Sequence, residues 1–165
     1  MEFHALVYFP DIRSEKIDIF RKKYDPKWNV IPPHITLVFP FSDYAEDHIL
    51  EHVKKVTLDS RPFNIHLHGL EIIENELIFL LVKEGRDEIM NIHDHLYSGI
   101  LANLEQQYLF EPHITLGELP PTEIKGAFEK AEAMNLDFLV RFDKIMLIKG
   151  DGTSPAQTVA TFELK

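Results

Sequence analysis

The sequence predicts an α+β protein in which two similar lobes, related by a pseudo-twofold axis, face each other across a central cleft. Strand-like and helix-like segments alternate in the same order in both halves of the chain, and one tetrapeptide occurs once in each half. Each lobe is therefore expected to be an antiparallel-rich sheet with helices outside. With 165 residues, 45% of them hydrophobic, the chain can bury a full core. We expect one bilobal domain over residues 1–165, with lobes from approximate repeats 1–72 and 76–165.

Hydrophobic periodicity defines the elements of the first repeat. The pattern predicts, in order, a strand over residues 3–9, a helix over 13–24, a strand over 34–39, a helix over 44–57 and a strand over 62–69.

The second repeat follows the same order, and its first helix shows the clearest apolar face, formed by Ile89, Ile92, Leu96, Ile100 and Leu104. A Gly150-Asp151-Gly152 turn precedes the last segment. The predicted elements are a strand over 77–83, a helix over 86–104, a strand over 113–117, a helix over 121–133, a strand over 136–149 and a final strand over 157–163.

The repeated tetrapeptide is His-Ile-Thr-Leu, and each copy directly follows a proline. The copies begin at His34 and His113, so Thr36 and Thr115 occupy the third positions. Side chains alternate between the two faces of a strand, so each histidine shares a face with its threonine while the aliphatic residues point into a core. An imidazole can transfer a proton near neutral pH, and a Thr hydroxyl can donate a hydrogen bond to a phosphoryl oxygen. If the lobes face each other, the two copies form one site suited to phosphate chemistry.

Composition limits the partners. The net charge of −10 disfavours binding to long nucleic acids, double-stranded ones included, but permits a small nucleotide or an RNA end. The basic cluster of Arg21, Lys22, Lys23 and Lys27 is interrupted by Asp25, and we expect it to be the solvated end of a helix. The absence of cysteine, of a signal peptide and of a membrane-spanning segment favours a cytoplasmic protein without a membrane partner, and we expect a monomer.

Other residues are weaker candidates for the cleft. Apolar and polar residues alternate strictly over residues 63–68, which places His66 and His68 on one face of a strand. They either line the cleft or face the solvent. Tyr8 either stacks on a base in the cleft or is a core residue with its hydroxyl at the edge. The pair His66 and His68, and the pair His48 and His52, have spacings that could hold a metal, but neither comes with an accompanying ligand cluster in the sequence. We therefore expect no metal site.

The paired motifs resemble those of the two-histidine (2H) phosphoesterase superfamily, which includes the 2'-5' RNA ligase-like proteins and the cyclic phosphodiesterases. The stretches from Arg21 to Leu37 and from Tyr108 to Gly117 are more closely similar to an uncharacterised bacterial branch of phosphoesterases. The resemblance covers nearly the whole chain. It implies a 2H fold, no obligatory metal or other cofactor, and catalysis by His34, Thr36, His113 and Thr115.

The chemical hypothesis is hydrolysis of a phosphodiester, cyclic or 2'-5', in a small nucleotide or an RNA end. One histidine removes a proton from water and the other protonates the leaving oxygen, while the two threonines bind the phosphate. The sequence does not say which histidine is the base. RNA end joining by the same four residues, and a non-catalytic nucleotide-binding or interaction module, are the alternatives.

Overall fold

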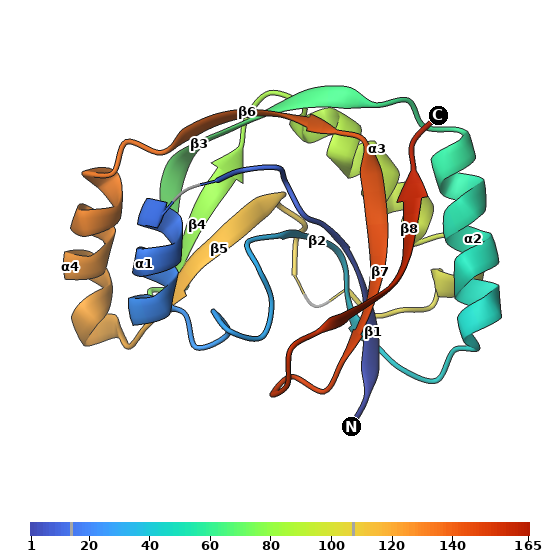
Figure 1. The fold of residues 1–165 in the computed structure, drawn as a ribbon, viewed down its shortest axis with the longest axis horizontal. Helices are drawn as coiled ribbons and strands as arrows, with labels where there is room; N and C mark the ends of the chain where they lie inside the picture. Colours follow the sequence, from blue (N-terminus) through green and yellow to red (C-terminus); the bar gives the residue numbers. More distant parts are fainter. Residues whose placement is uncertain (14, 107) are drawn as a thin grey trace.

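The computed structural model describes residues 1–13, 15–106 and 108–165, in which the strands form one curled sheet with helices packed on its outside (Figure 1). The strands are β1 (Phe3–Tyr8), β2 (Ile35–Phe41), β3 (Phe63–Ile73), β4 (Leu77–Val82), β5 (His113–Glu118), β6 (Asp137–Phe142), β7 (Lys144–Gly150) and β8 (Gln157–Glu163). The helices are α1 (Glu15–Tyr24), α2 (Glu46–Leu58), α3 (Arg86–Leu96) and α4 (Pro121–Glu132), with a short 3-10 helix, η1 (Gly99–Leu101).

The predicted α+β class is confirmed, and the two expected sheets are the halves of one eight-stranded sheet. Its strand order is β6-β3-β4-β5-β2-β1-β7-β8, and the pairs are antiparallel. The halves join at the centre through a single registered pair, Ile35 of β2 and Ile114 of β5. This junction is where the two repeated tetrapeptides lie.

The halves of the sheet do not coincide with the repeats at residues 1–72 and 76–165. Strand β3 pairs with β4 and β6, whereas β7 and β8 continue from β1. Helices α1 and α4 contact strands of the β6-to-β5 half, and α2 and α3 contact strands of the β2-to-β8 half (Figure 1). Elements from both parts of the chain therefore build each half of the sheet.

Two predicted elements differ most from the observed ones. The helix predicted over 86–104 ends at Leu96, because Ser98 is extended and Gly99 adopts a positive φ of 56°. The strand predicted over 136–149 is two strands that meet at Asp143, since β6 pairs with β3 and β7 pairs with β1. The periodicity of the sequence predicts the extended backbone, but it does not predict that the chain changes its pairing partner from β3 to β1.

The main core lies between the sheet and the four helices, and a smaller cluster lies on the opposite face. That cluster contains Ala5, Val7, Ile31 and Ile148. Strands β1 and β7 thus carry packed side chains on both faces. Among the residues described, none of the helices has the length and apolar character that crossing a membrane requires.

Candidate active site

The two tetrapeptides lie side by side on the central strands. Ile35 and Ile114 are fully buried in the main core and face each other across the β2–β5 junction. Extending this antiparallel register by one residue in each direction sets Thr115 opposite His34 and Thr36 opposite His113, on the face away from the main core. The predicted convergence of the two motifs agrees with this geometry.

A backbone carbonyl two residues earlier orients each histidine. The Nδ1 atom of His34 lies 2.8 Å from the carbonyl oxygen of Pro32, and that of His113 lies 2.5 Å from the carbonyl oxygen of Glu111. In each case the ring donates its Nδ1–H, which leaves the lone pair on Nε2. Both rings therefore have the tautomer that a general base needs at Nε2.

Burial lowers the pKa of both histidines, because an imidazolium loses hydration when it leaves water. For His113 the pKa falls to about 4, with the Glu111 carbonyl opposing the shift and His34 adding to it. For His34 burial is again the largest cause; the Pro32 carbonyl opposes it and Arg21 adds to it. Both rings are thus neutral at pH 7 in the free protein.

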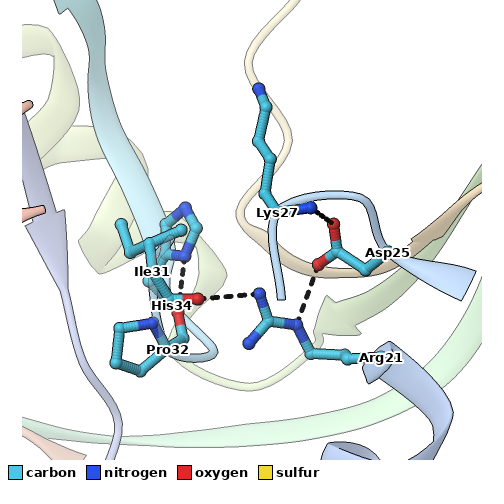
Figure 2. Close-up of polar contacts among 6 residues, drawn as sticks. All are labelled: Arg21, Asp25, Lys27, Ile31, Pro32 and His34. Carbon is cyan, nitrogen blue, oxygen red and sulfur yellow. Dashed lines mark hydrogen bonds and ion pairs between the residues drawn. The ribbon is translucent and has the colours of Figure 1, made fainter. Parts of the chain in front are cut away.

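An ion pair stabilises the segment that carries His34 (Figure 2). The guanidinium of Arg21 donates from Nε to Asp25 at 2.9 Å and from Nη2 to the carbonyl oxygen of Ile31 at 2.8 Å. The Asp25 carboxylate also accepts the backbone N–H of Lys27 at 2.9 Å. Arg21 and Asp25 are only 3% and 7% exposed. The expectation that Arg21 belongs to a solvated helix end is therefore wrong, since its side chain is buried and hydrogen-bonds to the loop before His34.

A second arginine, Arg86, fixes the segment that precedes His113. Arg86 binds both carboxylate oxygens of Glu111, with donor–acceptor distances of 2.9 and 2.8 Å, and the Glu111 carbonyl holds His113. Arg86 lowers the pKa of the Glu111 carboxyl, which keeps this pair charged. Each histidine thus follows a segment pinned by an arginine and a carboxylate. Sequence reasoning missed this role because neither pair forms a recognisable motif.

An aromatic ring covers His113. Phe79 of β4 stacks on the imidazole with ring centroids 3.4 Å apart and planes 10° apart. Phe9 approaches His34 more loosely, edge-on at 6.3 Å. The signal for Phe79 was the unbroken apolar run of β4, Leu77–Val82, because such a run indicates a strand covered on both faces.

Tyr8 does not line the cleft. Its side chain is 1% exposed in the main core, packs on Phe142 with ring centroids 4.4 Å apart, and donates its hydroxyl to the carbonyl oxygen of Arg141. It shares a face with Leu6, and strand alternation turns that face toward the helices. The cleft prediction for Tyr8 is wrong, and the core alternative holds.

His66 and His68 lie on the face of β3 opposite the buried Ile65 and Leu67. Their rings are 4.0 Å apart, and both are near Glu84. Strand β4 separates β3 from β5, so these histidines lie beside the His113 site and not within it.

Two neutral imidazoles, each with a hydroxyl opposite it on one face of a curled sheet, are groups that acid–base chemistry on phosphate esters can use. Comparison with known proteins identifies the family. A family model described as the 2'-5' RNA ligase superfamily matches residues 9–154. The chain belongs to this superfamily of 2H phosphoesterases.

Individual relatives are similar over most of their length. A Bacillus licheniformis protein named "putative phosphoesterase" is 28% identical over 149 residues, which are 84% of this chain and 86% of that protein. A protein of the same name from Bacillus thuringiensis is 31% identical over 119 residues, 69% of this chain and 68% of that one. The predicted class, a hydrolase acting on phosphoric ester bonds, agrees with the family and these names.

Solved structures share the fold. Escherichia coli LigT in complex with 3'-AMP has a TM-score of 0.64 at 16% identity, covering 99% of this chain and 98% of LigT. TT0787 of Thermus thermophilus has a TM-score of 0.65 at 17% identity, covering 98% and 97%. The predicted 2H phosphoesterase fold is confirmed.

Proposed function

We propose that the protein hydrolyses a cyclic or 2'-5' phosphodiester of a small nucleotide or an RNA end, with His34 and His113 as the acid–base pair. The observation that carries this proposal is the matched pair of Nδ1–carbonyl hydrogen bonds, which leaves two Nε2 atoms free to exchange protons. The names of the relatives support the ester class. Crystals of LigT with 3'-AMP, ATP and NADP+ support a nucleotide-like substrate, since those ligands bind a protein of the same fold.

The reaction needs the two rings in opposite protonation states. One neutral ring takes a proton from water as the water oxygen attacks phosphorus, and the other ring, as imidazolium, gives a proton to the leaving oxygen. Both rings are neutral in the free protein, so the acid must acquire its proton when substrate binds. A phosphodiester anion near Nε2 favours the charged form and raises the pKa of that ring. Substrate binding therefore creates the acid.

The threonines would stabilise the transition state. Thr36 and Thr115 would donate hydrogen bonds to non-bridging oxygens, each contributing roughly 2.7–4 kcal/mol if well placed. A net charge of −10 favours small substrates over long RNA. End joining by the reverse reaction uses the same residues and is the second candidate, because the family description names a ligase.

The test is turnover of 2',3'-cyclic nucleotides and 2'-5'-linked dinucleotides in the presence of a chelator. We expect His34→Ala and His113→Ala each to lower kcat by roughly 10²–10⁴. The matched control is His95→Ala, because His95 is exposed on α3 and its ring donates to the carbonyl of Asn91 in its own helix. Near wild-type turnover in either motif variant would exclude that histidine from the chemistry. Binding of these nucleotides without turnover would favour the interaction module.

A further inference from the structure

A second cluster of ionisable side chains occupies the same face of the sheet as the histidine site. His66 and His68 of β3 and Glu84, which follows β4, each offer one ligand atom, and these atoms lie within 4.8 Å of one another. Asp137 of β6 completes the group, since it lies opposite His68 in the register. Sequence spacing could not show this cluster, because Glu84 and Asp137 are 18 and 71 positions from His66.

A neutral His66 ring cannot donate hydrogen bonds to both of the carboxylates beside it. Its Nε2 lies 2.7 Å from Asp137 and its Nδ1 lies 2.9 Å from Glu84. A neutral imidazole has one N–H, so it can donate to only one of the two carboxylates, and its other nitrogen then presents a lone pair to an anion. Two species resolve the conflict, namely an imidazolium or a cation held between Nδ1 and Glu84.

His68 favours the cation. Among the residues that the structure describes, its Nε2 is buried without a hydrogen-bond partner, and it lies 3.4 Å from the same Glu84 oxygen that faces His66. A proton on His66 leaves this nitrogen unsatisfied, whereas one metal ion binds both imidazoles and the carboxylate. A divalent ion also balances the negative charges of Glu84 and Asp137.

The spacing fits zinc. Tetrahedral bonds of about 2.0–2.1 Å put neighbouring ligand atoms roughly 3.3 Å apart, and the Glu84 oxygen lies 2.9 and 3.4 Å from the two imidazole nitrogens. Two imidazoles and a carboxylate are a common zinc ligand set that leaves one coordination position open. Asp137 would accept the Nε2–H of His66 and fix its tautomer, as second carboxylates do at zinc sites.

The backbone holds the ligands in place. The N–H of His66 donates to the carbonyl of Glu84 at 3.0 Å, and the N–H of Lys83 donates to the carbonyl of His66 at 2.9 Å. Gly85 has a φ of 83°, and a Cβ there would lie 2.6 Å from the Ile65 side chain, so only glycine lets this turn pack against β3. Side-chain exposures of 20% for His66 and 37% for His68 leave an entry path for an ion.

We propose that His66, His68 and Glu84 form a zinc site, with Asp137 positioning His66, that ties β3 to the turn after β4 beside the phosphoesterase site. The ion is not part of the acid–base chemistry, because β4 separates β3 from β5. The proposal therefore stands independently of the proposed function.

The test is titration of chelator-treated, full-length protein with zinc chloride by calorimetry. We expect one equivalent to bind, with affinity lowered at least tenfold in His68→Ala and in Glu84→Gln, and about 10- to 100-fold in Asp137→Asn. His48→Ala is the control, because this histidine is exposed on α2, and it should bind like wild type. Cobalt should give the visible spectrum of a four- or five-coordinate site in wild type and lose it in His68→Ala.

Three outcomes would overturn the proposal. Wild-type protein that binds no zinc, with His66 titrating as an imidazolium between its two carboxylates, would show an ion-pair network instead. Equal binding by wild type and both ligand variants would place the ion elsewhere. Loss of binding in His34→Ala or His113→Ala, with the cluster intact, would assign it to the other histidines.

Discussion

Lowering the pH should destabilise the folded protein through His113. Burial lowers the pKa of this ring from its ordinary 6.5 to about 4 in the folded state. Between these values the unfolded chain binds the proton more tightly, so stability falls as pH decreases through this window. The shift predicts a loss of about 2 kcal/mol in the free energy of unfolding between pH 7 and pH 5.

The assay compares wild type with His113→Gln, which keeps a neutral polar side chain but removes the titration. Urea unfolding at intervals from pH 7 to pH 5 gives the free energy for each protein, and their difference isolates His113 because the remaining groups titrate in both. We expect the difference to change by about 2 kcal/mol over this range. A difference that stays constant, or an NMR titration of His113 near 6.5, would refute the burial argument.

Three further predictions concern the surroundings of the site. The pH profile of kcat/KM should be bell-shaped with its maximum below pH 6.5. This ratio reports the free protein, in which the pKa values of both histidines are lowered. A maximum above pH 7 would contradict this prediction. Arg21→Met should lower the free energy of unfolding by about 3–5 kcal/mol, because the buried Asp25 carboxylate loses its ion-pair partner. The control Lys22→Met, at an exposed position, should change this free energy little. Equal urea midpoints for the two variants would argue against the ion pair. Phe79→Ala should let water reach the imidazole of His113 and raise its pKa toward 6.5 by NMR, and an unchanged pKa would exclude Phe79 as a cause of burial.

The local pattern was enough to predict the arrangement of each motif. Alternation along a strand separates Ile35 and Leu37 from His34 and Thr36 whatever the rest of the chain does, and the structure buries both aliphatic residues completely. The element order was predictable for the same reason. The partners of β3 and β7 were not, because pairing depends on contacts far apart in the sequence, and the chain changes halves at Asp143 without a break in its strand-like pattern.

Residues that act through tertiary contacts escaped prediction. Arg21 sits among exposed lysines, so its neighbours suggested a solvated helix end, and only the folded loop shows that its guanidinium reaches the Ile31 carbonyl. His66 and His68 were recognised as sharing a face, but Glu84 joins them through the turn after β4. Tyr8 kept two alternatives, the cleft and the core, because an isolated strand has two faces and sequence alone did not say which one the helices cover.

The two histidines share their orientation and their neutral state in the free protein, although an aromatic ring stacks closely on His113 alone of the two. Each donates Nδ1–H to a carbonyl two residues earlier, each has a pKa lowered by burial, and each follows a segment fixed by an arginine and a carboxylate. These shared features do not select one ring as the acid. In the proposed mechanism the bound substrate would make the choice, because the ring beside the leaving oxygen is the one whose protonation assists bond cleavage. A substrate bound in the reverse orientation would exchange the roles of the two rings, so under the proposed function the orientation of the bound nucleotide would determine the direction of proton transfer.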